Sequence, residues 1–170
     1  MDNEELELVD YQGKVIGRAP RSKIHSNNSL LHRVVHMLIF NSRGEILLQR
    51  RSPEKDIAPG KWDTSVGGHV APGESIEEAL EREAREELSI SIDNPERLYR
   101  YIHKNSRESE LVYSFKGYFD GELTVSNREV SEVRFWGIQE IIDVIDDNIF
   151  SNNFRDEFMR YLDHVNMTDP

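Results

Sequence analysis

Residues Gly67–Ile90 read GGHVAPGESIEEALEREAREELSI, and this stretch decides how the rest of the chain is interpreted. Its apolar spacing predicts a helix from Ser75 to about Leu88, with Pro72 and Gly73 in the loop before it. The helix is rich in glutamate, which is common on a solvated surface. The position of those glutamates around the helix therefore carries the information.

The predicted helix places carboxylates on its apolar face. At about 100° per residue, five apolar side chains share an arc of roughly 180°. These are Ile76, Ala79, Leu80, Ala84 and Leu88. Glu83 and Glu87 fall inside this arc, and Glu86 lies at its edge. Carboxylates at positions i, i+3 and i+4 converge on one patch, where a hard divalent cation offsets their mutual repulsion. The pattern predicts a metal site.

The alternative is a solvated helix held by pairs of Glu and Arg. It accounts for Glu81 with Arg85 and for Glu78 with Arg82. It does not account for the carboxylates inside the apolar arc, because a buried, unpaired carboxylate is very costly. Metal binding is the better explanation.

Composition limits the class of protein. The 170 residues suit one domain. The formal net charge of −11 argues against binding to a nucleic acid polymer or an anionic membrane, since both need a basic footprint. An anionic small molecule stays possible, because a few local cations or a metal reverse the charge of one site. The absence of cysteine excludes disulfides and thiol nucleophiles. With no apolar leader and no membrane-length apolar run, we expect a cytoplasmic protein.

The remaining segments predict strands around one central helix, with helices at the end of the chain. Residues 1–25 read as an N-terminal hairpin extension. RVVHMLIF and EILLQRR read as a second hairpin that turns at Gly44, and WDTSV as a short strand leading into the glutamate-rich stretch. β-rich runs follow at RLYRYIHK, ELVYSFKGYF and VRFWG, and then helical patterns at IQEIIDVI and NFRDEFMRYLDHV. We expect an α/β sandwich with a mixed central β-sheet.

The spacing of Gly68, Glu74, Arg82-Glu83, Glu86-Glu87 and Ile90 resembles the Nudix box, the signature of a family of Mg²⁺-dependent diphosphate hydrolases. The resemblance implies an α/β/α sandwich, a single Nudix domain over residues 1–170 and a box loop and helix over 67–90. Ser89 stands where the family usually has Gly, and Ala84 where a larger aliphatic residue is common. Both departures affect turn geometry and packing rather than chemistry.

The same resemblance implies the roles of the box residues. Mg²⁺, or Mn²⁺, would be bound by Glu83, Glu86 and Glu87 and by the carbonyl of Gly67. Glu83 and Glu86 would serve catalysis, with Glu83 as the candidate general base. Arg82, grouped with them as a catalytic-site residue, would hold the shape of the box by pairing with Glu74.

Within the family, the chain is similar to the type 1 isopentenyl diphosphate isomerases. A second metal site is implied by residues that match their ligands: His25, His32, His69, Glu108 and Glu110. Arg51 and Lys55 match cations that hold the substrate diphosphate there, and Lys61 is a further candidate phosphate contact. Glu110 is the second candidate for the general base.

One position separates this chain from the isomerases. They need a catalytic cysteine just before the Gly-His pair, where this chain has Gly67. A complete box without the thiol favours hydrolysis of a diphosphate linkage in a nucleoside diphosphate derivative or a related small molecule. Two alternatives stay open: an enzyme like isopentenyl-diphosphate delta-isomerase, and a non-catalytic nucleotide-binding module.

Overall fold

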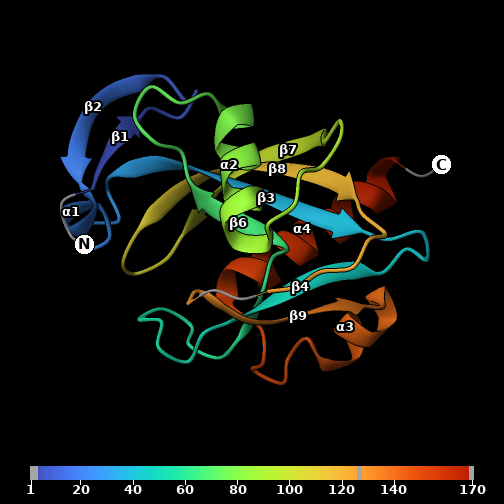
Figure 1. The fold of residues 1–170 in the computed structure, drawn as a ribbon. Coiled ribbons are helices and arrows are strands. Elements are labelled where there is room, and N and C mark those ends of the chain that lie inside the picture. The colour runs from blue at the N-terminus through green and yellow to red at the C-terminus, as the bar shows by residue number, and fades with distance from the viewer. Residues whose placement is uncertain (1–3, 126–127, 169–170) are drawn as a thin grey trace. The chain divides into compact units, whose positions relative to one another are not determined.

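The computed structural model describes residues 4–125 and 128–168. Its strands and helices follow the predicted order (Figure 1). The strands are β1 (Glu5–Val9), β2 (Val15–Pro20), β3 (Leu31–Phe40), β4 (Ile46–Arg51), β5 (Trp62–Asp63), β6 (Val66–His69), β7 (Glu96–Lys104), β8 (Ser109–Tyr118) and β9 (Val130–Trp136). The helices are α1 (Arg21–Ile24), α2 (Ile76–Leu88), α3 (Ile138–Val144) and α4 (Asn152–Thr168).

Backbone contacts divide the chain into two compact units. The first unit contains residues 1–38 and 66–117, and the second contains residues 39–65 and 118–170. The predicted single domain of residues 1–170 stays a prediction. Its ends, residues 1–3 and 169–170, lie outside the described residues.

The first unit is built on β3. This strand pairs with β1 at Leu8 and with β6 through the antiparallel pairs His36–Gly67 and Val35–Gly68. β8 pairs with both β3 and β7. The predicted N-terminal hairpin is present, because β1 and β2 are antiparallel, and it is followed by the short helix α1, which the sequence did not predict. Small apolar clusters hold the strands together, one of them formed by Val34, Tyr101 and Val112.

The second unit contains the other predicted hairpin. β3 ends in this unit and pairs with β4 at Phe40–Ile46, and the turn contains Gly44 at φ +75°. β4 also pairs with β5 and β9. The core of the second unit is aromatic, with successive ring contacts between Trp62 and Trp136, Trp136 and Phe150, and Phe150 and Phe154.

The segment WDTSV differs from its prediction. It forms not one strand but two, because β5 ends at Asp63 and β6 begins at Val66. The hydroxyl of Ser65 accepts the backbone N–H of Ile39 and donates to the carbonyl of Leu47, so a side chain replaces the ladder contacts at the break. Gly67 and Gly68 consequently lie in strand β6 and not in a loop. In the described part of the chain, no helix is both long and apolar enough to cross a membrane.

Candidate functional site

Helix α2 is defined at both ends by local chemistry. Ser75 caps its N-terminus by accepting the N–H of Glu78, and the Glu78 carboxylate accepts the N–H of Ser75 in return. The helix ends at Ser89, which adopts the left-handed conformation at φ 57°. These limits agree with the predicted helix. The helix packs against β6 (Figure 1).

Two of the box glutamates lie on that buried face. Glu87 is 7% exposed, and its Oε1 accepts the backbone N–H of Gly67 at 3.0 Å. Glu83 packs against Gly68 so closely that a Cβ at residue 68 would lie 2.1 Å from the Glu83 carboxyl carbon. Gly68 is therefore required by close approach of a side chain. Glu86 differs, since its side chain is 58% exposed.

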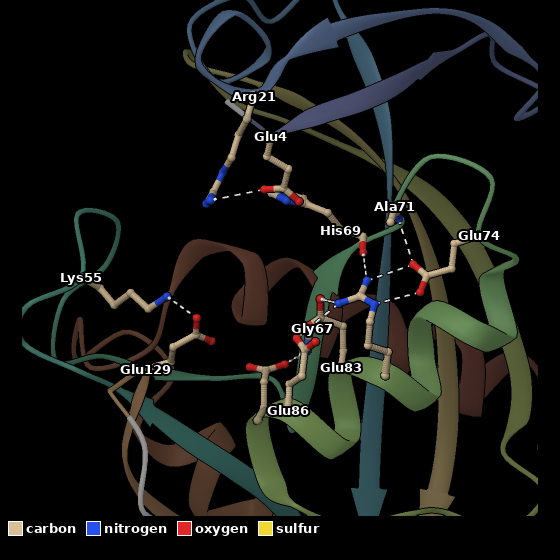
Figure 2. A network of polar contacts seen from close by, with 12 residues as sticks. Glu4, Arg21, Lys55, Gly67, His69, Ala71, Glu74, Glu83, Glu86 and Glu129 are labelled. Carbon is tan, nitrogen blue, oxygen red and sulfur yellow. Dashed lines mark hydrogen bonds and ion pairs between the residues drawn. The ribbon is translucent and has the colours of Figure 1, made fainter. Parts of the chain in front are cut away.

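Arg82 is the centre of the polar network in the box, and Figure 2 labels its partners Glu74, Glu83, Glu86 and His69. Its Nε and Nη2 donate to the two carboxylate oxygens of Glu74 at 2.8 and 2.9 Å. Nη1 donates to Glu83 at 2.8 Å and to Glu86 at 3.3 Å, while Nη2 also donates to the carbonyl of His69 at 2.9 Å. The expected pairing with Glu74 is thus present. It lowers the pKa of the Glu74 carboxyl and raises that of Arg82, so this ion pair persists across ordinary pH.

Each of the three box carboxylates accepts a hydrogen bond from a neighbouring group. In the described part of the chain, two groups of three side chains bring possible metal ligands within 4.8 Å of one another, and neither contains a box glutamate. Arg82 holds Glu83 and Glu86, whereas the N–H of Gly67 holds Glu87. Each carboxylate has two oxygens, so a metal at the box would share Glu83 and Glu86 with Arg82 and would share Glu87 with the N–H of Gly67.

The histidines and glutamates expected at a second metal site do come together. One group is His25, His32 and His69, and the other is His32, Glu108 and Glu110. The three imidazole centroids are 5.2–5.7 Å apart. Nε2 of His25 lies 3.1 Å from a Glu108 oxygen, and Nε2 of His32 lies 3.9 Å from a Glu110 oxygen.

Burial sets the charge of this cluster. Desolvation lowers the pKa of His32 to about 3 and holds the pKa of His69 well below its usual value. Burial also lowers the pKa of His25, against the opposing attraction of Glu108. Neutral imidazoles beside carboxylates are the donor set that a divalent metal requires. The residues of this cluster fit a metal site.

Arg21 is a neighbour of the cluster that sequence reasoning missed. Its charge lowers the pKa of all three histidines, and its guanidinium lies 3.7 Å from Glu4 (Figure 2). Arg21 precedes His25 by four residues, and the N–H of His25 donates to its carbonyl in one helical turn. A short helical pattern at residues 21–25 would have been the signal, because residues four apart share a helix face.

His36 fills the space beside Gly67. Its side chain is buried, as expected for a histidine in the apolar run of β3. A Cβ added to Gly67 would lie 3.3 Å from Cδ2 of His36 and 3.6 Å from its Nε2. Any side chain at residue 67 would therefore contact the His36 ring.

The three cations predicted to bind phosphate belong to the second unit, where each has an acceptor. Arg51 donates from Nε to the carbonyl of Ile57 at 2.8 Å and from Nη1 to Asp63 at 3.3 Å. Lys55 lies 3.7 Å from Glu129, an ion pair that Figure 2 also shows. Lys61 donates to the side chain of Asn148 at 2.5 Å. Arg51 and Lys61 are neighbours, because the N–H of Arg51 donates to the carbonyl of Lys61.

Comparison with known proteins identifies the family. The family model of the NUDIX domain matches residues 30–160, and the chain therefore belongs to the Nudix family. Within the family it lies in the branch related to type 1 isopentenyl-diphosphate isomerases. It is 34% identical over 148 residues to the isopentenyl-diphosphate Delta-isomerase of Salmonella arizonae, which covers 84% of this chain and 81% of that protein. It is 33% identical over 131 residues to the enzyme of the same name from Mycolicibacterium vanbaalenii, covering 74% and 72%.

Solved structures give the fold class directly. The DR0079 protein of Deinococcus radiodurans superposes with a TM-score of 0.80 at 27% identity, over 92% of this chain and 98% of that one. A MutT protein from Methanosarcina mazei Go1 gives 0.68 at 30% identity, over 78% and 94%. The fold is the Nudix α/β/α sandwich with a mixed β-sheet, as the sequence predicts.

Proposed function

We propose that this protein is a Nudix hydrolase that uses Mg²⁺, or Mn²⁺, to cleave a diphosphate linkage in a nucleoside diphosphate derivative or a related small molecule. One observation carries the proposal: α2 presses Glu83 and Glu87 into its apolar face against Gly67 and Gly68. Burying carboxylates on an apolar face is costly unless they bind a cation. Because the chain contains a Nudix domain, we expect that cation to serve hydrolysis.

The chain's own residues have distinct roles in this proposal. Glu83, Glu87 and the carbonyl of Gly67 would hold the cation, with Glu86 assisting from its exposed position. When bound, the cation supplies positive charge to the phosphate oxygens as negative charge develops on them. Arg82 does not touch the reacting atoms, because its donors are directed to Glu74, Glu83, Glu86 and the His69 carbonyl. It positions the carboxylates.

The proposed reaction is hydrolysis of a P–O–P linkage. The oxygen of water forms a bond to one phosphorus atom, the bridging P–O bond breaks, and its electron pair leaves with the second phosphate. The proton lost by water passes to a carboxylate. Glu83 is the candidate base, and Glu110 the second candidate. Arg51, Lys55 and Lys61 stay the candidate phosphate contacts, because their positive charge suits a phosphate oxygen.

The second candidate function is isomerisation of isopentenyl diphosphate. The cluster of His25, His32, His69, Glu108 and Glu110 favours it, because the isomerases use matching residues for a metal and the curated relatives carry that name. Against it stands Gly67, which brings no thiol and whose side-chain space is bordered by the His36 ring. Without a proton donor at this position, isomerisation lacks one of its two acid–base partners.

The test is product formation with excess Mg²⁺ across a panel of nucleotides, nucleotide sugars and isopentenyl diphosphate. Wild-type protein is compared with Glu87→Gln, which keeps the side-chain volume and removes the charge. Glu81→Gln is the matched control, since Glu81 is exposed on the same helix and pairs with Arg85 at 3.0 Å. We expect cleavage that is lost in Glu87→Gln and retained in Glu81→Gln.

Each other outcome has a definite meaning. Unchanged turnover in Glu87→Gln would contradict the assignment of Glu87 as a metal ligand. An allylic product from isopentenyl diphosphate would establish the isomerase. Ligand binding without turnover on any compound would favour the non-catalytic module.

A further inference from the structure

Glu7, on β1, is a carboxylate that the proposed reaction does not use. It lies outside residues 30–160, the segment matched by the family model. Its side chain is 11% exposed, and its Oε1 accepts from Nη2 of Arg33 at 2.8 Å and from the backbone N–H of Gly73 at 3.2 Å. Its Oε2 lies 4.0 Å from Arg18. One carboxylate thus joins three strands to the loop that precedes α2.

The contact with Gly73 leads directly into the box. Gly73 has φ +78°, a backbone conformation that residues with a side chain rarely adopt. It immediately precedes Glu74 in the chain. Glu74 accepts both the N–H of Ala71 and the guanidinium of Arg82. Arg82 in turn donates to Glu83. A continuous series of contacts therefore runs from Glu7 to a proposed metal ligand.

We propose that Glu7 is a positioning residue for the box metal site. It fixes the loop of residues 71–74, so that Glu74 and Arg82 hold Glu83 in place before the metal binds. A role as counterion for the partly buried Arg33 would explain only one hydrogen bond of Glu7, because that role does not need the N–H of Gly73. The inference rests on the proposed function, since it assigns Glu7 to the same metal site.

The experiment is a calorimetric titration of the full-length, metal-free protein with Mn²⁺. Binding at the box is defined as the heat that disappears in Glu87→Gln. Glu7→Met fills similar space without oxygens, Glu7→Gln keeps one acceptor, and Glu5→Gln is the control on an exposed position of the same strand. Loss of one or two hydrogen bonds predicts a Kd for Mn²⁺ raised about fivefold or more in Glu7→Met. We expect less than about a twofold change in the other two variants.

Amide hydrogen exchange of the metal-free protein supplies the second measurement. The Gly73 amide should exchange faster in Glu7→Met, and to a smaller degree in Glu7→Gln, because an amide oxygen is a weaker acceptor than a carboxylate. Should Glu7→Met fail to fold, the exchange rate in Glu7→Gln decides, and a rate equal to that of the wild type overturns the inference.

Two results separate this inference from the proposed function. Normal Mn²⁺ affinity in folded Glu7→Met, together with a lower melting temperature, would make Glu7 purely structural while the metal site survives. Absence of Glu87-dependent binding in the wild-type protein would remove the proposed function and this inference with it.

Discussion

Gly68→Ala offers a sharp separation of stability from activity. The substitution adds a single methyl group to β6, at a glycine whose backbone does not require positive φ. The added Cβ would lie 2.1 Å from the carboxyl carbon of Glu83 and 2.3 and 2.5 Å from its two oxygens. All three distances are shorter than real Cβ contacts.

The size of the clash predicts its effects. Ordinary contact begins at 3.4 Å, so the Glu83 carboxylate must move by about 1.3 Å. The carboxylate is the far end of a flexible side chain, and the fold can accommodate the movement by rotating it away. We expect a loss of stability of about 1–2 kcal/mol, mainly from the hydrogen bond between Arg82 and Glu83. A displacement of about 1 Å at a reacting group costs roughly a hundredfold in rate.

The assay measures kcat for the substrate identified in the panel, together with the melting temperature and the Kd for Mn²⁺. Gly17→Ala is the matched control, because a Cβ there meets its nearest neighbour, in Leu8, at 3.9 Å. We expect normal kcat in Gly17→Ala and a large loss in folded Gly68→Ala. Wild-type kcat and Mn²⁺ affinity in Gly68→Ala would refute the reasoning, since Glu83 could then leave its position without consequence.

Three further predictions concern stability and specificity. Ser89→Gly should stabilise the protein by roughly 0.5–1 kcal/mol in chemical denaturation, because Ser89 is an exposed non-glycine residue at φ 57°; an unchanged or lower value would contradict the assigned strain. In proton NMR, Gly67→Cys should form no allylic isomer from isopentenyl diphosphate. Its melting temperature should fall, because the new Cβ would lie 3.3 Å from the His36 ring. Appearance of the isomer would show that the missing thiol alone separates this chain from the isomerases. The free energy of unfolding should fall as pH decreases from about 6.5 toward 3, because the pKa of His32 is about 3 when folded and the unfolded chain therefore binds more protons in that window. The slope is about 1.4 kcal/mol per pH unit for each proton, and a His32→Gln protein with the same slope as the wild type would contradict the assignment.

The sequence predicted the features that depend on local patterns. Helix α2 was predicted from its apolar spacing, and the structure adds the capping pair of Ser75 and Glu78 at its start. Burial of Glu87 followed from its place on the apolar arc, and pairing of Arg82 with Glu74 from their positions in the box.

Features that depend on contacts between distant segments were not predictable in the same way. Nothing near Gly73 in the sequence indicates that Glu7 would accept its N–H across 66 positions. The break between β5 and β6 depends on Ser65 bonding to residues of two other strands. The number of Arg82 contacts was missed as well, because the carbonyl of His69 is reached only after β6 and α2 have packed together.

Arg82 also links the two groups of candidate ligands in the first unit. Through the His69 carbonyl it contacts the residue that contributes one imidazole to the histidine cluster, and through Glu83 it contacts the box. The histidine cluster is closely assembled, with ligand atoms within 4.8 Å, whereas the box glutamates are held by Arg82 and Gly67. A metal would enter a site of closely spaced ligands at the histidines and would share the box carboxylates with Arg82 and Gly67.

Anomalous diffraction from crystals soaked in Mn²⁺ tests the proposed box metal site most directly. We predict a manganese peak bound by carboxylate oxygens of Glu83 and Glu87 and by the carbonyl of Gly67, in addition to any peak at the histidine cluster. The box peak should disappear in crystals of Glu87→Gln. Manganese bound only among the histidines, with no peak at Glu83 and Glu87, would contradict the assignment of these carboxylates as the hydrolytic metal site.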